Sequence, residues 1–202
     1  MLEPLPRVLS LKDINAIRYY LNECESNSLT QRQLHELIKQ NSYDRLSEET
    51  KIKLVKAENL KIDDLIPNPI IIKNNESYEG LSEYALKQSI LNNLDGFLMQ
   101  LGSGFTYVGN EYKIKLGDRY NYIDLLLFNY EYNCFVVVEL KVTELKKEHI
   151  GQIQVYMNYV DHNLRKFNQD RTIGIIICRE NDKYIIKYSS DERIISRVYE
   201  LV

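Results

Sequence analysis

The chain has 202 residues and carries 26 Lys and Arg against 29 Asp and Glu, which gives a net charge of −3 at pH 7. Hydrophobic residues make up 44% and charged residues 27% of the chain, so a globular protein with one substantial core is expected and a disordered chain is excluded. The net charge also excludes a broadly basic surface that binds polyanions by charge alone, so any nucleic-acid binding has to be local.

Three helices are predicted near the start of the chain. Apolar residues recur at helical spacing over 11–24, where Ser10 is the expected N-cap. Thr30 and Gln33 form a capping-box pattern ahead of a second helix, and Ser47 is the expected cap of a third. Such a trio is typical of a helix-turn-helix, of a dimerisation element or of simple packing, and the balanced charge of this region favours packing.

A connecting segment is predicted at residues 61–76, where Asp, Asn and Pro residues punctuate the chain. It places a boundary near residue 75. The expected domains are a helical N-terminal region with its linker at 1–75 and a second domain at 76–202.

The second domain is expected to start with a helix that begins near Gly80 or Leu81 and ends at Gly102. The remaining elements are predicted as strands at 105–108, 112–116, 122–128, 134–141, 172–178 and 183–188, and as helices at 146–161 and 191–200. The order is therefore helix, three strands, helix, strand, followed by a shorter tail.

Two carboxylates are predicted to face each other across a β-hairpin. A polar turn at residues 130–133 joins the third and fourth strands, and a symmetric closure puts Phe128 opposite Phe135 and Asp124 opposite Glu139. Their Cα atoms would then lie about 4.5 to 5.5 Å apart. Like charges directly opposite in a sheet are destabilising, so a compensating group is expected.

A divalent cation is the simplest compensating group. Side-chain alternation places Lys141 on the same face as Glu139, which gives one face two acids and a base. Two alternatives stay open, namely a hairpin slipped by one residue and an ordinary ion pair between Lys141 and one of the acids.

These residues carry a resemblance to a known group of enzymes. Asp124, then Glu139-x-Lys141, then a helix with Gln152-x-x-x-Tyr156 resembles the PD-(D/E)XK nuclease superfamily. The proline that often precedes the first acid in that superfamily is replaced by Ile123.

Longer segments are similar to the YhcG family within that superfamily. They are residues 97–109, 122–126, 139–141 and 174–178, and the similarity extends over residues 76–202. Residues 28–46 are similar to the end of the family's helical N-terminal domain, which is usually longer, so this chain is expected to be shortened at its front.

The resemblance implies an α/β fold with a restriction-endonuclease-like core. Such a core is a central mixed sheet flanked by helices in the order α-β-β-β-α-β, here preceded by a small helical region. It implies a metal-dependent endonuclease that hydrolyses phosphodiester bonds, most often in DNA, and leaves a 5′-phosphate and a 3′-hydroxyl. Mg²⁺ or Mn²⁺ would be bound by Asp124, Glu139 and the backbone carbonyl of Leu140, and Lys141 would position a water or stabilise an oxyanion.

Three further residues are candidates for the site. Gln152 and Tyr156 lie one helical turn apart and are expected to hold Lys141 or a phosphate oxygen, although Tyr156 also fits a buried stripe and Gln154 competes with Gln152. Glu83 is expected to be an outer metal ligand, with Glu79 an equal candidate.

The expected partner is nucleic acid, and a homodimer is one expected arrangement. The cysteines are odd in number and widely spaced, which indicates reduced, buried thiols in a cytoplasm; they are Cys24, Cys134 and Cys178. The charged N-terminus predicts no secretory leader and no membrane association. Two other functions stay open: a nucleic-acid-binding module without catalysis, and an interaction subunit of a DNA defence or repair complex.

Overall fold

The computed structural model describes residues 8, 10–74, 78–189 and 191–202. The chain divides into two compact units, one of Met1–Asn68 with Gln100–Ser103 and one of Pro69–Met99 with Gly104–Val202. The boundary predicted near residue 75 falls on residues 75–77, and the leader prediction rests on residues 1–7, so both lie outside the described residues.

The first unit is helical. The capping box of Thr30 with Gln33 and the N-cap at Ser47 are confirmed, whereas the first helix is capped by Asp13 rather than by Ser10. A short helix also lies inside the segment predicted as a linker. The helices are α2 (Ile14–Ser26), α3 (Gln31–Lys39), α4 (Glu48–Lys56) and α5 (Ile62–Leu65).

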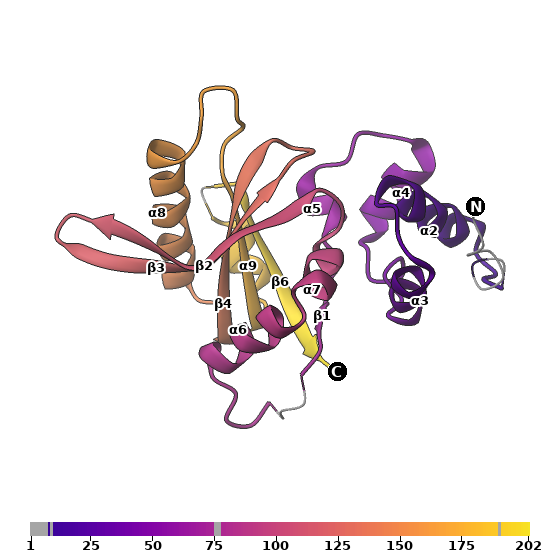
Figure 1. Ribbon diagram of the computed structural model, residues 1–202, viewed down its shortest axis with the longest axis horizontal. Coiled ribbons are helices and arrows are strands. Elements are labelled where there is room, and N and C mark those ends of the chain that lie inside the picture. Colours follow the sequence, from indigo (N-terminus) through magenta and orange to yellow (C-terminus); the bar gives the residue numbers. More distant parts are fainter. Residues whose placement is uncertain (1–7, 9, 75–77, 190) are drawn as a thin grey trace. The chain divides into compact units, whose positions relative to one another are not determined.

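The second unit contains a six-stranded mixed sheet with the strand order β1-β6-β5-β4-β3-β2 (Figure 1). The first four strands of that order run parallel, and β4, β3 and β2 pair antiparallel. The strands are β1 (Ile70–Ile72), β2 (Phe105–Leu116), β3 (Arg119–Asn129), β4 (Cys134–Glu144), β5 (Ile173–Glu180) and β6 (Ile194–Leu201).

Helices flank this sheet. The single helix predicted before the strands is two helices, α6 (Glu83–Asn92) and α7 (Leu94–Leu101), and Gly102 ends the second with a φ of +97°. Helix α8 (Lys147–Asn163) connects β4 to β5 and packs against both, while α6 packs against β4. The predicted order of helix, three strands, helix, strand is confirmed, and with it the α/β fold class.

Two predictions for the end of the chain are wrong. Residues 183–188 form a helix, α9 (Lys183–Lys187), because the Asp182 side chain accepts hydrogen bonds from the backbone N–H groups of Tyr184 and Ile185. The helix predicted at 191–200 is replaced by the strand β6 (Ile194–Leu201), because β6 lies between β5 and β1 and pairs parallel with both. Local spacing could not show these partners.

The core is deepest in the central strands. Val136, Val137 and Val138 are fully buried, as are residues 175–178 of the neighbouring strand. The three cysteines are free and buried, as predicted. Within the described residues, every helix is either too short or too polar to cross a lipid bilayer.

Candidate active site

The predicted site lies where β3 and β4 separate. The hairpin register is confirmed, since Phe128 lies opposite Phe135 and pairing continues to Leu125 opposite Val138. A slip by one residue is therefore excluded. Asp124 lies one step further, and its Oδ2 accepts a hydrogen bond of 3.0 Å from the backbone N–H of Leu140. Beyond this point β3 continues with β2 alone, and β4 continues with β5.

Glu139 is almost fully buried, with 2% of the residue exposed. Burial raises the pKa of its carboxyl group to about 8, the charge of Asp124 acts in the same direction, and Lys141 opposes both. Asp124 is held near Glu139 by its hydrogen bond to the backbone N–H of Leu140, the next residue along β4. Glu139 Oε1 is a buried oxygen without a hydrogen-bond partner in the described part of the chain. The site therefore contains an acid that the polypeptide does not fully compensate.

Lys141 lies on the same side of β4 as Glu139 and is also buried. Its Nζ is 3.4 Å from Glu139 Oε2 and 3.6 Å from Glu83 Oε2. The predicted alternative of an ion pair is thus present, but it reaches only one oxygen of Glu139. Glu83, at the first position of α6, is brought to the site by this contact.

Gln152 and Tyr156 extend from α8 towards Glu139. The amide Nε2 of Gln152 donates to Glu139 Oε2 at 3.1 Å and to the Tyr156 hydroxyl at 3.2 Å. Both amide hydrogens are thereby used, which fixes the orientation of the side chain. Gln152 was expected to hold Lys141 or a phosphate oxygen, and in the structure its amide donates to Glu139, the carboxylate beside Lys141.

Two charged residues of the site were missed from the sequence. Lys87 of α6 is buried, and its Nζ lies 2.8 Å from Glu111 Oε1 and 3.6 Å from Asp124 Oδ1. Burial acts to lower the pKa of Lys87, but the Glu111 hydrogen bond and the Asp124 charge outweigh it, so the pKa is raised. The available signal was a lysine one helical turn after Glu83 on the face that buries Leu86 and Ile90.

Glu111 has an unusual backbone. It adopts a φ of +46° within β2, a backbone conformation that residues other than Gly, Asn and Asp rarely adopt. Such conformations are concentrated at functional sites because the surrounding structure has to enforce them. Here the conformation accompanies a carboxylate that pairs with a buried lysine of the site.

The donor set fits a hard divalent cation. Among residues 8, 10–74, 78–189 and 191–202, no group of three or more His, Cys, Asp and Glu side chains is arranged to hold a metal ion. Mg²⁺, however, is commonly bound through one or two carboxylates, with waters and substrate phosphates as the other ligands. Asp124 and Glu139 supply two carboxylates, and the buried Oε1 of Glu139 lacks a partner that a cation would provide.

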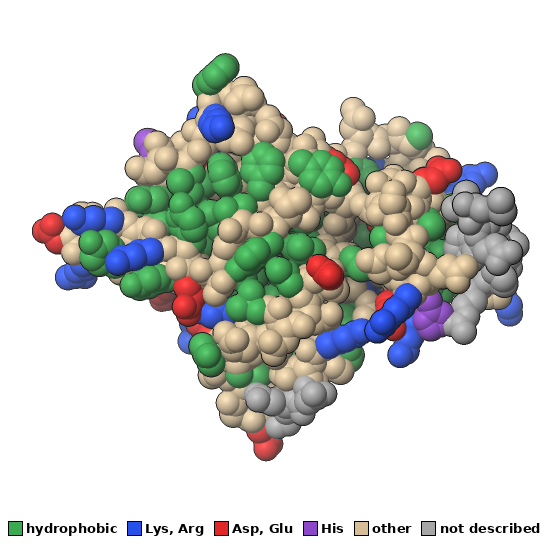
Figure 2. Space-filling model, viewed as in Figure 1, with side chains coloured by type: hydrophobic (Ala, Val, Ile, Leu, Met, Phe, Trp, Pro, Cys, Tyr) green, Lys and Arg blue, Asp and Glu red, His purple; other side chains and the backbone are tan. Residues whose placement is uncertain are grey.

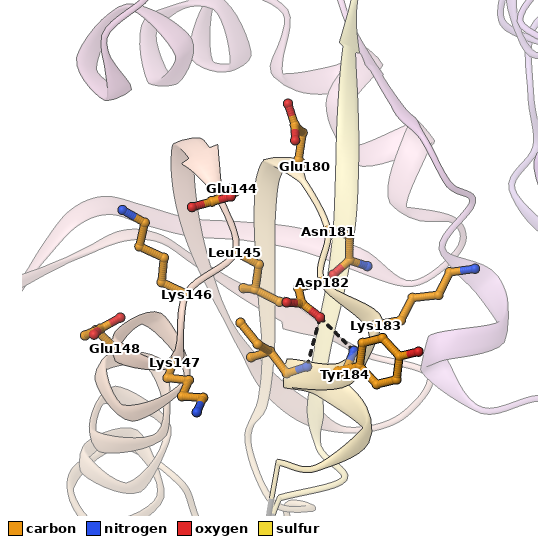
Figure 3. Close-up of a pocket in the computed structure, with 11 residues that line it drawn as sticks. Glu144, Leu145, Lys146, Lys147, Glu148, Glu180, Asn181, Asp182, Lys183 and Tyr184 are labelled. Atoms are coloured by element: carbon orange, nitrogen blue, oxygen red, sulfur yellow. Dashed lines mark hydrogen bonds between the residues drawn. The ribbon is translucent and has the colours of Figure 1, made fainter.

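A separate pocket of about 620 Å³ lies where β4 and β5 end (Figure 3). None of the predicted site residues lines it. Its Asp182 side chain is occupied in capping α9, and the Lys146 and Lys183 side chains extend away from each other. Its charged groups do not converge on a ligand position. The candidate site therefore remains the one at the separation of β3 and β4.

The chain is similar to a known protein family. The sequence model described as "YhcG PDDEXK nuclease domain" matches residues 64–199. This range includes all the residues of the site described above.

A curated relative and two solved structures are also similar. The protein described as "Putative nuclease YhcG" from Escherichia coli (strain K12) is 28% identical over 188 residues, with 88% of this chain and 50% of the relative covered. This chain therefore spans about half the length of that relative. 

Two solved structures give weaker likenesses, each with 19% identity and a TM-score of 0.44. The likeness to the first, "crystal structure of a repair endonuclease from Pyrococcus abyssi", covers 62% of this chain and 49% of that chain. The second, "Structure of EndoMS-dsDNA2 complex", covers 63% and 49% respectively. At a TM-score below 0.5, neither likeness bears on what this chain does.

Proposed function

Because the chain belongs to the YhcG PDDEXK nuclease domain family, we propose that its site hydrolyses phosphodiester bonds of nucleic acid, with DNA as the substrate and Mg²⁺ or Mn²⁺ as the cofactor. The observation that carries this proposal is the buried carboxylate of Glu139. It lies beside Asp124 and Lys141 and keeps one oxygen without a partner.

The charges of the site support a cation. Four carboxylates and two lysines are connected by ion pairs or by close approach, so the fully ionised site has an excess of negative charge. Bound by Asp124 and Glu139, with the Leu140 carbonyl as a further ligand, Mg²⁺ or Mn²⁺ would neutralise charge on the scissile phosphate and lower the pKa of a bound water.

The protein's own side chains have separate roles in this proposal. Lys141 would donate a hydrogen bond to the attacking water or to the developing oxyanion, since its ammonium group lies next to the carboxylates. Gln152 holds Glu139 Oε2, and Tyr156 accepts a hydrogen bond from the amide of Gln152. Gln152 and Tyr156 are thus positioning residues.

The test is cleavage of defined substrates by the purified protein. Supercoiled, linear, branched and single-stranded DNA and RNA are incubated with Mg²⁺, Mn²⁺ or EDTA. We expect DNA cleavage that requires the metal and falls by at least about 100-fold in Asp124→Ala and in Lys141→Ala. Glu192→Gln and Lys166→Ala remove exposed charges elsewhere in the second unit and should cleave as the wild type does.

Two results would contradict the proposal. Cleavage that survives in both site variants comes from a contaminating nuclease. Absence of cleavage for every substrate and metal, with the protein folded, would favour the binding module or the interaction subunit. DNA affinity without a cleavage product would indicate the binding module, and absence of DNA affinity would indicate the interaction subunit.

A further inference from the structure

The hairpin of β2 and β3 continues past the site as a two-stranded ribbon. Strand β3 pairs with β4 only from Leu125 onwards, so its first residues, from Arg119 to Ile123, pair with β2 alone. The free end of the hairpin projects beyond α8 (Figure 1). This part of the molecule therefore presents a two-stranded ribbon next to Asp124.

One side of the ribbon belongs to the core. Ile114 and Ile123 are 1% and 0% exposed and lie in a buried cluster with residues of α8, against which Tyr112 and Leu116 also pack. These contacts hold the ribbon in place. The opposite side consequently faces away from this packing.

The opposite side carries lysine and tyrosine in pairs. Lys113 lies across from Tyr122, and Lys115 lies across from Tyr120. Tyr120 and Tyr122 are 55% and 53% exposed, and Lys113 Nζ lies 3.9 Å from the centroid of the Tyr120 ring. We call Lys113, Lys115, Tyr120 and Tyr122 the hairpin face.

The hairpin face is continuous with the candidate active site. Side chains alternate along a strand, so Tyr120, Tyr122 and Asp124 lie on the same side of β3. At a rise of about 3.3 Å per residue, the two tyrosines are about 13 Å and about 7 Å from Asp124 along the strand. A nucleic-acid strand bound at Asp124 would reach both within a few nucleotides, because even a strand stacked as in a duplex rises about 3.4 Å per nucleotide.

The local charge also suits a polyanion. Residues 112–122 contain Lys113, Lys115 and Arg119 against Asp118 alone, whereas the whole chain has a net charge of −3. In Figure 2, Lys and Arg side chains gather with hydrophobic-class side chains over the free end of this hairpin. This is the kind of local basic patch that an acidic protein needs to bind nucleic acid.

We propose that the hairpin face binds an unpaired nucleic-acid strand adjacent to the scissile phosphate, an inference that rests on the proposed function of the site. The lysines contact phosphates, and the tyrosines stack on bases. Exposed aromatic rings between cationic side chains are the usual platform for single strands, since every base has a stacking face that a duplex hides.

The experiment measures binding of a fluorescein-labelled single-stranded DNA oligonucleotide and of its blunt duplex by fluorescence anisotropy in EDTA. Tyr120→Ala and Tyr122→Ala should each weaken single-strand binding by about 5- to 150-fold, while Tyr120→Phe and Tyr122→Phe keep wild-type affinity. The double variant Lys113→Gln/Lys115→Gln should lower the slope of log affinity against log salt by about 1.4.

A matched control is available on α9. Lys187 and Tyr188 form another exposed cation–aromatic pair, with Nζ 5.6 Å from the ring centroid, and Lys187→Gln/Tyr188→Ala should bind single strands as the wild type does. Thermal unfolding of every variant shows whether it is folded, and the Phe variants keep the test valid where an Ala variant does not fold.

The outcomes separate this inference from the proposed function. Unchanged single-strand affinity in the tyrosine variants, or tighter wild-type binding to the duplex, overturns the hairpin face. If the protein cleaves nucleic acid and the hairpin variants bind single strands normally, the role of the hairpin face is overturned and the proposed function stands. Single-strand binding through the hairpin face without any cleavage leaves it standing and overturns the proposed function instead.

Discussion

At the scale of single residues, the burial of Glu139 both destabilises its charged form and suits it to bind a cation. Its carboxyl group is buried beside Asp124, and Lys141 and Gln152 both contact the same oxygen, Oε2. A charged carboxylate in this position is poorly solvated, which is why its pKa is raised. The same lack of compensation is what leaves Oε1 available to a cation.

This environment predicts a pH-dependent stability in the absence of metal. The folded protein binds the Glu139 proton with a pKa of about 8, against 4.5 for the ordinary carboxyl group. Glu139 therefore favours the folded state fully below about pH 4.5 and loses this contribution as the pH rises to about 8. In EDTA, the melting temperature of the wild type should fall relative to that of Glu139→Gln between pH 5 and pH 9.

The control for this prediction is added metal. Millimolar Mg²⁺ should raise the melting temperature of the wild type at pH 9 and leave Glu139→Gln nearly unchanged, because the cation stabilises only the ionised carboxylate. If the melting temperatures of the two proteins change with pH in the same way, the charge of Glu139 is already compensated in the folded chain.

At the scale of elements, the contact between β5 and α8 supports the site. Gly174 lies under α8, and a Cβ atom built on it would come 2.5 Å from Met157 Sδ and 2.8 Å from Ile153 Cδ1. The close approach of strand and helix thus depends on the missing side chain. It keeps α8, and with it Gln152 and Tyr156, at the distance that lets Gln152 reach Glu139.

The same substitution at two glycines should have opposite effects. Gly174→Ala is expected to lower the free energy of unfolding by about 1–3 kcal/mol, because the added methyl group overpacks a buried contact. Gly151→Ala, in α8 with nothing within 4 Å of its Cβ position, should raise it by about 0.5–1 kcal/mol through helix propensity. Urea denaturation measures both, and a neutral Gly174→Ala would show that the Met157 and Ile153 side chains rearrange to admit the methyl group.

At the scale of the whole molecule, a bound cation is expected to stabilise only one of the two compact units against unfolding. Asp124, Glu139 and Lys141 all belong to the second unit, and α2, α3 and α4 belong to the first. A ligand stabilises the cooperative unit that binds it. Metal binding is therefore expected to leave the first unit unaffected.

Hydrogen exchange followed by mass spectrometry tests this expectation. With Mg²⁺ at about 100 times its dissociation constant, the slowest-exchanging amides of β3, β4 and β5 should exchange about 100-fold more slowly, and those of α2, α3 and α4 at an unchanged rate. Glu139→Gln should remove the effect. Equal slowing in both units would mean that they unfold as one.

Local chemistry explains which features could be predicted from the sequence. The caps at Thr30 and Ser47, the helix stop at Gly102 and the hairpin register are each set by neighbouring residues. The hairpin brought Asp124 close to Glu139 because two strands joined by a short turn have little freedom in their pairing. Lys141 followed from side-chain alternation alone.

Features that depend on distant segments could not be predicted in this way. Lys87 and Glu111 meet from a helix and a strand 24 residues apart, and both ends of β6 depend on strands that the local spacing does not identify. Turn chemistry and side-chain period were sufficient to predict most of the elements, the hairpin and the two acids with their lysine. The packing of elements that are distant in the sequence sets how deeply Glu139 is buried, which of its oxygens has no partner among the described residues, and which lysine approaches Asp124. These features could not be predicted, because burial and charge pairing are properties of packed elements.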